Sequence, residues 1–492
     1  MLTKSLLAAA IAAAAFSNAA SASIASGDLI AIGSLSGSGA GLNADLSGLT
    51  GTLENGVAAN YLGGIGSGLA YAGGNIFIAT PDRGPNAVAY NSGLDDTASY
   101  ISRFQTLSLD LSTNHSGTGL AYNLAPKLVS TTLLSSATAL NYGAGVGKQI
   151  DGVTPVGNGA PALNAANNTY YFTGRSDNFG SANPLTGIPD ASSANASNAR
   201  FDPEGVRVSN DGKSVFISDE YGPYVYQFDR ATGQRIRVFN LPANLDVAKL
   251  SPVGKTEESN TSGRVDNKGM EGLALTPDGK TLVGIMQAPL LQDGKKSGID
   301  RIVTIDIATG ATHEYAYQLT TGSGVSEIVA INDHEFLVDE RDGSGLGNGD
   351  SAAVKQLFKI DLSGATDISA FSGSTAALQA TAVPKTLFLD VVKSLNANGI
   401  SSDKIPAKLE GVSFGRDITD GGVLYHTLFV ANDNDFLPNV AGTNQFYVFA
   451  FADSELNYQA QQFSAVPVPG AVWLFGSALM GFVGRSVRKN RC

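Results

Sequence analysis

Cysteine is almost absent from this chain of 492 residues, and the only one, Cys492, is the last residue. A single cysteine excludes intrachain disulfides and cysteine-based metal sites. Histidine is also scarce, because only His115, His313, His334 and His426 occur, scattered singly along the chain. A histidine-based metal site is therefore not indicated.

Charged residues make up 15% of the chain, against about 25% in average soluble domains. Lysine and arginine number 32 against 44 aspartates and glutamates, which gives a net charge of −12. Nucleic acid binds basic surfaces, so this balance argues against a nucleic-acid partner. We expect a divalent cation as the partner instead.

Residues 1–22 have the composition of a secretory signal peptide. Lys4 supplies a positive start, residues 6–16 form an apolar run, and Ala20-Ser21-Ala22 is a small-x-small cleavage site. We therefore expect the mature chain to begin near Ser23 and to work outside the cytoplasm.

Residues 466–492 contain a second targeting pattern. Val-Pro-Val-Pro-Gly at 466–470 precedes an apolar run at 471–484, and Arg485, Arg488, Lys489 and Arg491 follow. The run is shorter than the roughly 20 residues of a membrane-spanning helix, and the basic residues would remain cytoplasmic. This order resembles the PEP-CTERM sorting signal of Gram-negative bacteria, which an exosortase processes, with Val468 in place of the usual glutamate. The resemblance implies an extracellular or cell-surface protein with transient membrane contact through its tail. A simple C-terminal membrane anchor is the alternative.

Residues 27–465 consist of short apolar runs separated by glycine, asparagine and aspartate, which is typical of strands and turns. One unit recurs: an acidic residue and a glycine, an apolar strand, a tight turn, and a second strand that ends in acidic residues. The clearest copies run from Asp202 to Glu220 and from Glu271 to Met286, each with an Asp-Gly turn. Asp-Gly between apolar runs is the strongest short-range hairpin signal. A helix is expected only near residues 384–398.

Weaker copies of this unit begin at Gly68, Glu327 and Glu410, and a sixth is expected at Asp151-Gly152 with a second strand at 170–173. The long intervals between copies leave room for two outer strands per unit, such as residues 224–229 and 235–240. Four strands repeated six times predict an all-β fold, a β-propeller with six blades. A pair of β-sandwiches is the competing interpretation, and the irregular period argues against a β-helix.

Four motifs within residues 60–450 resemble one known family. They are Ser-Gly-Leu-Ala-Tyr at 67–71, Asp-Pro-Glu-Gly at 202–205, Ser-Asp-Glu-Tyr-Gly-Pro at 218–223 and Asn-Lys-Gly-Met-Glu-Gly-Leu at 267–273. In this order they are similar to the phytase-like family known as "esterase-like activity of phytase". The resemblance implies hydrolysis of phosphoesters, and it does not identify catalytic residues.

Hairpin geometry predicts that the acidic residues of the repeat gather at one end of the fold. The start of the first strand and the end of the second strand lie together in an antiparallel hairpin. Circular repetition then brings these residues to one rim: Asp82, Glu204, Asp219, Glu220, Glu271, Glu327, Asp339, Glu340, Glu410 and Asp433. So many carboxylates cannot all stay ionised without a cation, and oxygen ligands alone select Ca²⁺ before Mg²⁺ or Mn²⁺. All of them except Glu340 are candidate metal ligands. The alternative is that the glutamates only join neighbouring repeats, by accepting hydrogen bonds from backbone N–H groups of the next blade.

Familiar hydrolase motifs are missing or misplaced. Gly-Val-Ser-Phe-Gly at 411–415 matches the nucleophile-elbow pattern, but it falls within a repeat strand and not at a strand-to-helix turn. The sequence contains no Arg-His-Gly segment of histidine phosphatases and no phosphate-binding loop.

Two classes of function remain. In the first, a metal-dependent hydrolase of phosphoesters or other esters, Glu204 and Glu271 hold the metal and Arg207 clamps the phosphate of a small-molecule substrate. Further candidates for the clamp are Arg83, Lys268 and Arg341. In the second class, the propeller is a calcium-stabilised extracellular binding or matrix protein. The arginine and lysine side chains named above then only form ion pairs with neighbouring acidic residues.

Overall fold

The structure is a computed structural model. It describes residues 24–37, 43–53, 55–86, 97–142, 168–174, 192–250, 257, 259–371 and 374–463. The expected signal peptide at 1–22 and the expected sorting tail at 466–492 lie outside the described residues. Within the described residues, no helix has the length and apolar character needed to cross a membrane.

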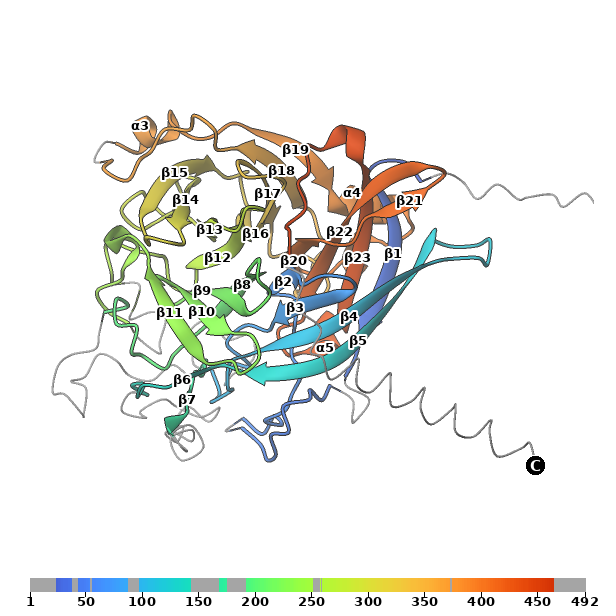
Figure 1. The fold of residues 1–492 in the computed structure, drawn as a ribbon. Helices are drawn as coiled ribbons and strands as arrows, with labels where there is room; N and C mark the ends of the chain where they lie inside the picture. Colours follow the sequence, from blue (N-terminus) through green and yellow to red (C-terminus); the bar gives the residue numbers. More distant parts are fainter. Residues whose placement is uncertain are drawn as a thin grey trace, which may run out of the picture.

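Five antiparallel sheets stand around a common axis as the blades of a β-propeller (Figure 1). The blades are numbered along the chain, and each is given with its innermost strand first. The first blade consists of β2 (Gly68–Tyr71), β3 (Ile76–Thr80), β4 (Arg103–Thr113) and β5 (Tyr122–Leu133). The second consists of β8 (Pro203–Val208), β9 (Ser214–Asp219), β10 (Tyr224–Asp229) and β11 (Arg235–Asn240). The third consists of β12 (Met270–Leu275), β13 (Thr281–Met286), β14 (Ile299–Asp306) and β15 (Thr312–Gln318).

The last two blades complete the ring. The fourth consists of β16 (Gly324–Ala330), β17 (Glu335–Arg341), β18 (Lys355–Asp361) and β19 (Lys385–Asp390). The fifth consists of β20 (Lys408–Phe414), β22 (Val423–Asp433), β23 (Asn444–Ala452) and β1 (Asp28–Leu35), with β21 (Ile418–Asp420) paired to β22. The outermost strand of the fifth blade thus comes from the beginning of the described chain, so the two ends of the propeller are joined in one sheet.

The all-β propeller confirms the predicted fold class, but the predicted number of six blades is wrong. The innermost strands neighbour one another in the order β2, β8, β12, β16, β20 and back to β2. The sixth unit forms no blade, because β7 (Tyr170–Tyr171) pairs with β6 (Ser135–Ser136) in a two-stranded sheet. Asp151-Gly152 lies outside the described residues. The Thr80 hydroxyl donates to the carbonyl of Glu204 at 2.8 Å, so the first blade abuts the second directly.

The hairpins between first and second strands form as the sequence predicts. Two of them have Asp-Gly turns in which Gly212 and Gly279 have φ of 69° and 74°, a region that glycine adopts without strain. Pro203 pairs with Asp219 across β8 and β9, so the start of one strand lies beside the end of the next. The expected outer strands 224–229 and 235–240 are β10 and β11.

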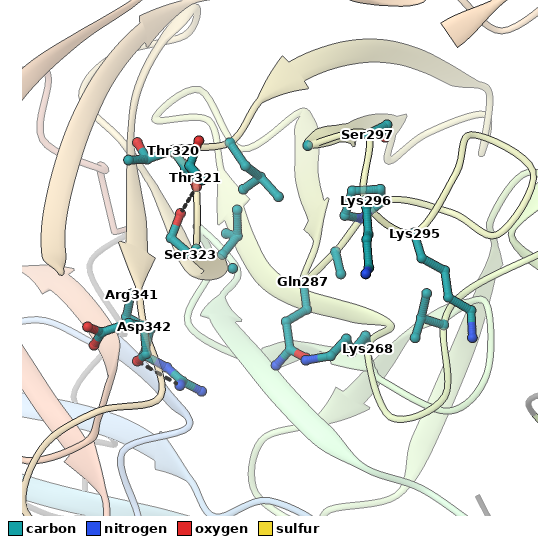
Figure 2. A pocket seen from close by; sticks show the side chains of 18 of the residues that line it. Lys268, Gln287, Lys295, Lys296, Ser297, Thr320, Thr321, Ser323, Arg341 and Asp342 are labelled. Atoms are coloured by element: carbon teal, nitrogen blue, oxygen red, sulfur yellow. Dashed lines mark hydrogen bonds between the residues drawn. The ribbon is translucent and has the colours of Figure 1, made fainter. Parts of the chain in front are cut away.

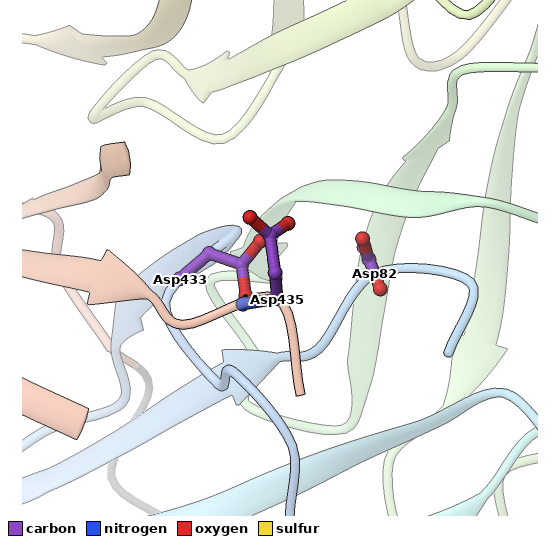
Figure 3. A group of neighbouring side chains, drawn as sticks. All are labelled: Asp82, Asp433 and Asp435. Atoms are coloured by element: carbon purple, nitrogen blue, oxygen red, sulfur yellow. Dashed lines mark hydrogen bonds between the residues drawn. The ribbon is translucent and has the colours of Figure 1, made fainter. Parts of the chain in front are cut away.

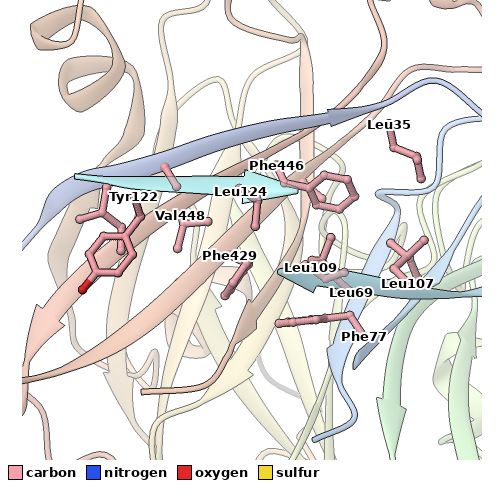
Figure 4. Close-up of a cluster of buried hydrophobic side chains, with 14 of the residues drawn as sticks. Leu35, Leu69, Phe77, Leu107, Leu109, Tyr122, Leu124, Phe429, Phe446 and Val448 are labelled. Carbon is pink, nitrogen blue, oxygen red and sulfur yellow. The ribbon is translucent and has the colours of Figure 1, made fainter. Parts of the chain in front are cut away.

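Hydrophobic side chains fill the spaces between neighbouring blades. Between the first and fifth blades, Leu69, Phe77, Phe429 and Phe446 are at most 2% exposed, and the Phe77 and Phe429 ring centroids are 4.7 Å apart (Figure 4). Further clusters lie at the other blade junctions. Burial of one such side chain stabilises the fold by about 1.5–3 kcal/mol, so contacts between blades hold the ring closed.

Helices are few and short among the described residues. The helix expected at 384–398 forms only in its second half, as α4 (Val391–Ala397), because Lys385–Asp390 pair with β18. The Asp390 side chain caps this helix by accepting a hydrogen bond from the N–H of Lys393. The other helical segments are α3 (Thr375–Gln379), α5 (Pro438–Ala441), and the 3₁₀ turns η2 (Ala243–Leu245), η3 (Ser402–Lys404) and η4 (Asp453–Glu455).

Residues 456–463 cross one end of the central channel. The N–H of Gln459 donates to the carbonyl of Ile331 at 2.8 Å, and Gln461 Nε2 donates to the carbonyl of Val208 at 2.6 Å. These partners lie near the hairpin turns of the fourth and second blades, away from the acidic ends of the strands. The acidic residues therefore lie at the end of the channel that this segment does not cross.

Candidate functional site

Three innermost strands place a glutamate in a β-bulge at the acidic end of the channel. The pairing registers of β8, β12 and β20 shift where Glu204, Glu271 and Glu410 lie. A glycine follows each glutamate and packs against the next innermost strand, since a Cβ at Gly272 would stand 2.7 Å from the nitrogen of Ile328. A bulge re-aims the side chain of its extra residue. The repeated Glu-Gly pair therefore combines close strand packing with a glutamate at the channel.

Glu327 occupies the glycine position of the fourth blade and is one residue out of step with the other glutamates. The register of β16 shifts between Val325 and Glu327. Glu327 Oε1 accepts hydrogen bonds from the N–H groups of Leu273 and Ile328, both at 2.9 Å. Its Oε2 lies 3.2 Å from Arg207 Nη2, and burial raises the pKa of Glu327 to about 8. The structure thus places Glu327 among backbone groups inside the channel and not beside the other glutamates.

Arg207 lies in the same interior. Its Nη1 donates to the carbonyls of Leu69 at 2.8 Å and Val206 at 2.5 Å, and its Nη2 donates to the carbonyl of Ile328 at 2.7 Å. These carbonyls belong to β2, β8 and β16. The guanidinium therefore ties three innermost strands together across the channel.

The second strands end in residues that contact the acidic end of the channel: Glu220 after β9, Gln287 after β13, Arg341 in β17 and Asp433 in β22. The residue one step earlier has different partners. Asp219 Oδ1 accepts the N–H of Asp202 at 3.1 Å, and burial raises the pKa of Asp219 to about 7. Glu340 accepts the Tyr317 hydroxyl at 2.6 Å and the Lys385 ammonium, which hold its pKa below the usual value although burial opposes them. Alternation along the strand therefore removes Asp219 and Glu340 from the channel.

Asp202, Glu204 and Glu220 form a group that we call the open acidic cluster. One carboxylate oxygen of each lies within 4.8 Å of the others, and all three residues are buried. Arg83 Nη1 lies 3.0 Å from Asp202 Oδ2 and 4.0 Å from Glu220 Oε2, and Glu220 Oε1 has no hydrogen-bond partner among the described residues. Burial, followed by the charge of Glu271, raises the pKa of Glu204 and of Glu220 well above its usual value. One guanidinium at the edge thus faces three carboxylates.

Asp82, Asp433 and Asp435 form a second group, which we call the ammonium cluster (Figure 3). One oxygen of each carboxylate again lies within 4.8 Å of the others. The Lys408 ammonium donates to Asp433 Oδ2 and, at 2.9 Å, to Asp435 Oδ1. Burial raises the pKa of Asp82 to about 7, whereas Lys408 lowers that of Asp435 against the effect of burial. This cluster contains its own cation.

Glu271 and Glu410 belong to neither cluster. Gln287 Nε2 donates to Glu271 Oε1 at 2.7 Å, and Glu271 Oε2 is without a hydrogen-bond partner in the described part of the chain. The Arg341 guanidinium donates to Glu410 Oε1 and lies 4.0 Å from Glu271 Oε1. Burial, followed by the charge of Glu410, raises the pKa of Glu271 to about 7. Glu271 is therefore a buried carboxyl group that titrates near neutral pH.

Asp339 lies on β17, opposite Glu327. Its Oδ2 has no hydrogen-bond partner among the described residues, and burial raises its pKa well above the usual value although Arg341 opposes this. Asp339 is part of neither cluster.

Of the predicted metal ligands, the structure brings Glu204 next to Glu220 and Asp82 next to Asp433. Both clusters could hold a metal ion. Sequence reasoning missed Asp202 and Asp435 as members, although Asp202 opens the Asp-Pro-Glu-Gly motif and Asp435 ends an Asn-Asp-Asn-Asp run.

Ser413 of the Gly-x-Ser-x-Gly match lies in β20, within a strand of the repeat as predicted. Its hydroxyl accepts the N–H of Tyr71 and donates to the carbonyl of Phe414, both at 3.0 Å. The bond to Tyr71 links β20 of the fifth blade to β2 of the first blade, so Ser413 has a structural role in this contact and is not part of a nucleophile elbow.

A curated relative of the chain is an uncharacterized secreted protein of Arthroderma benhamiae, 30% identical over 181 residues, which cover 29% of this chain and 35% of that protein. The chain thus spans about a third of the length of this relative. Among solved structures, the periplasmic gluconolactonase of Pseudomonas aeruginosa matches at 13% identity over 80% of this chain and 88% of its own, with a TM-score of 0.30. The PQQ-bound aldose sugar dehydrogenase of Streptomyces coelicolor matches at 10% identity over 83% of this chain and 84% of its own, with a TM-score of 0.31. Scores this low carry no argument about function. The sequence profile of the phytase-like family, described as "esterase-like activity of phytase", matches residues 60–436, and the chain belongs to this family.

Proposed function

We propose that this protein is an exported hydrolase of phosphate esters that depends on a divalent cation, Ca²⁺ before Mg²⁺ or Mn²⁺, held at the open acidic cluster. The observation that carries the proposal is the charge of that cluster. Three buried carboxylates share one guanidinium, and Glu220 Oε1 has no partner among the described residues. Membership of the phytase-like family supports the phosphoester class of substrate.

The residues of the open acidic cluster fit a hard cation. Asp202, Glu204 and Glu220 offer only carboxylate oxygens, which are the ligands that Ca²⁺ takes in proteins. When bound, the ion would polarise a phosphoryl oxygen and remove the repulsion between the carboxylates.

Other residues of the chain supply the remaining chemistry. Glu271 has an unpartnered Oε2 and a pKa of about 7, so it can take a proton from the attacking water at neutral pH. The guanidinium groups of Arg83 and Arg341 stand beside these carboxylates and can donate to phosphate oxygens. Arg207 has a different role in this proposal, because backbone carbonyls take its donors and it positions the innermost strands.

Export rests on the two terminal patterns. We infer that residues 1–22 are removed as a signal peptide and that residues 466–492 are a sorting tail for an exosortase at the cell surface of a Gram-negative bacterium. The relative from Arthroderma benhamiae, which is described as secreted, supports this inference. Intact-mass analysis of the protein from its native host tests it. A full-length species outside the cytoplasmic membrane would overturn it.

A second candidate function is a calcium-stabilised binding or matrix protein without catalysis. The ammonium cluster favours this function, because there a cation, the Lys408 ammonium, only pairs with the carboxylates of Asp433 and Asp435. In this case Ca²⁺ at the open acidic cluster would only stabilise the packing of the blades.

One experiment separates the two functions. The full chain is purified in chelator, and turnover of p-nitrophenyl phosphate, bis(p-nitrophenyl) phosphate and p-nitrophenyl acetate is measured as Ca²⁺ is added. The hydrolase predicts turnover of a phosphoester that rises with Ca²⁺ and is lost in Glu204→Gln. Ca²⁺ binding without turnover of any substrate would establish the second function. Absence of Ca²⁺ binding in calorimetry would overturn both.

A further inference from the structure

A cavity of about 640 Å³ opens beside the acidic end of the channel, between loops of the third and fourth blades (Figure 2). Its walls come from four segments that are far apart in the sequence: residues 265–268, 287–298, 318–325 and 341–343. Gln287 and Arg341 lie on the border of this cavity and also contact Glu271 and Glu410. The cavity is thus a side chamber of the channel mouth.

The chamber is strongly positive in a chain whose net charge is −12. Lys268, Lys295 and Lys296 lie on one side and Arg341 on the other (Figure 2). Lys295 and Lys296 are exposed, and neither forms an ion pair with a carboxylate among the described residues. Lys268 donates to Gln287 Oε1 at 2.9 Å and likewise has no acidic partner in the described part of the chain.

Among the described residues, Asp342 is the acidic residue that lines the chamber, and it does not cancel this charge. Asp342 Oδ1 is 2.5 Å from the ammonium of buried Lys355, and Asp342 Oδ2 accepts the N–H of Val354 at 3.0 Å. The negative charge of Asp342 is therefore already neutralised by Lys355 of the fourth blade. Arg341 is shared with Glu410, but the three lysines are available to a ligand.

The remaining walls are mixed. The polar residues Ser297, Gln318, Thr320, Thr321 and Ser323 line the chamber together with the apolar residues Val265, Ala288, Pro289, Leu319 and Val325. A volume of about 640 Å³ is in the range that holds small organic ligands. The usual ligand pocket is mostly apolar with a few polar groups, whereas this one adds four cationic side chains and several Ser and Thr residues, which suits an organic anion that carries hydroxyl groups.

We propose that this chamber binds a polyhydroxylated organic anion of monosaccharide size, with its phosphate or carboxylate group among Lys268, Lys295 and Lys296 and its hydroxyls against the Ser and Thr side chains. Charge-assisted hydrogen bonds from three ammonium groups supply the affinity, and the hydroxyl walls supply the preference for a sugar-like body. The inference goes beyond the proposed hydrolysis and does not depend on it, because binding is measured without any metal or turnover.

Isothermal titration calorimetry of the full chain in chelator at low salt tests the proposal, with glucose 6-phosphate, glucuronate, glucose and inorganic phosphate as probes. Glucose 6-phosphate or glucuronate should bind at least tenfold more tightly than glucose, and tighter than inorganic phosphate. The first two probes distinguish a phosphate from a carboxylate as the anionic group. The double variant Lys295→Met/Lys296→Met should weaken binding of the anionic sugar about tenfold, which corresponds to about 1.4 kcal/mol.

The matched control is Lys127→Met/Lys393→Met, which removes two exposed lysines far from the chamber and changes the net charge equally. Its affinity for the anionic sugar should equal that of the wild type. Equal weakening by both double variants would show a non-specific charge effect and overturn the proposal. Glucose binding as tightly as its phosphate, inorganic phosphate binding as tightly as the sugar phosphate, or no binding of any probe would also overturn it.

Discussion

The two clusters of carboxylates lie at the same end of the channel but are neutralised in different ways. In the ammonium cluster, Lys408 bonds to Asp433 and Asp435. In the open acidic cluster, the nearest cation is Arg83, which bonds to Asp202 and stands 4.0 Å from Glu220. In the ammonium cluster Lys408 lowers the pKa of Asp435, although burial raises that of Asp82 to about 7 and that of Asp433 well above its usual value. In the open acidic cluster, the pKa values of Glu204 and Glu220 are both raised well above the usual range, and neither is lowered.

The difference shows what a divalent cation would do in this fold. Lys408 comes from the first residue of β20, so its charge is attached to the chain and is always present. When Glu204 is aligned with Glu410, the equivalent position in the second blade is Asp202, a carboxylate in place of the ammonium. A buried carboxylate needs a partner cation or a proton. The second blade therefore leaves a place for an exchangeable ion where the fifth blade has a fixed one.

The largest effect is expected from Lys408→Met, which would turn the ammonium cluster into a second open cluster. Removing one partner of a buried ion pair costs about 3–5 kcal/mol, so thermal unfolding in chelator should move to clearly lower temperature. Added Ca²⁺ should recover part of the loss, and calorimetry should show one more bound ion than in the wild type. The exposed Lys127→Met serves as the control, with a change within about 0.5 kcal/mol. An unchanged melting temperature in Lys408→Met would show that the Lys408 ammonium does not stabilise the ammonium cluster.

The matched change in the open acidic cluster is Glu220→Gln. It should lower phosphoesterase activity about a hundredfold, a barrier rise of about 2.7 kcal/mol. The stabilisation by Ca²⁺, about 2.7 kcal/mol at a hundredfold excess over Kd, should also disappear. The metal-free variant should be more stable than the metal-free wild type, because one repelling carboxylate is gone. A less stable metal-free variant that still gains stability from Ca²⁺ would contradict the assignment of the cation to this cluster.

The stability of the metal-free protein should fall as pH rises from about 4 to 8. The pKa values of Asp82, Asp219 and Glu271 are raised to about 7 and that of Glu327 to about 8, mainly by burial. The folded protein therefore keeps protons that the unfolded chain releases above about pH 4, and this stabilisation is lost as pH passes the folded values. One pKa unit corresponds to about 1.4 kcal/mol, so the loss should exceed that amount.

Calorimetric melting in chelator at pH 5, 6, 7 and 8 measures this loss. Ca²⁺ should flatten the decline, because it replaces the protons of the open acidic cluster. A melting temperature that rises with pH in chelator would show that the carboxylates are ionised and fully compensated in the folded state.

The hairpins of the propeller could be predicted because their signals are local. The Asp-Gly turns and the short apolar runs in Ser214–Asp219 and Thr281–Met286 specify neighbouring strands without reference to the rest of the chain. The number of blades depends on which copies reach the channel, and within the described residues β7 of the sixth expected unit pairs with β6 and not with an innermost strand. The pairing of β1 with β23 joins residues more than 400 positions apart, so no local pattern announces it.

The sequence predicts that the candidate site lies at the ends of the strands, but it does not predict which carboxylates come together there. The Ser-Glu-Ile run at 326–328 resembles the Pro-Glu-Gly and Met-Glu-Gly runs of the second and third blades. In β16, however, the bulge lies at the residue before Glu327, so Glu327 occupies the position that glycine has in the other blades. The partner of a carboxylate is equally invisible in the sequence, because Arg83 reaches Asp202 from another blade. Only the packed ring decides which acidic residues share a cation.

The smallest effect is expected from Asp435→Asn in the ammonium cluster. Asp435 has a φ of 52°, which asparagine adopts readily, so the backbone is preserved. Its side chain is 35% exposed, and Lys408 keeps its bond to Asp433, so the loss should be at most about 1 kcal/mol. Because Lys408 lowers the pKa of Asp435, the contribution of this ion pair is present above the usual aspartate pKa and disappears as the pH falls through the folded value. The variant and the wild type should therefore differ in melting temperature at pH 7 and converge in acid, with phosphoesterase activity and Ca²⁺ stoichiometry unchanged. A hundredfold loss of activity in Asp435→Asn would instead move the functional cation to the ammonium cluster.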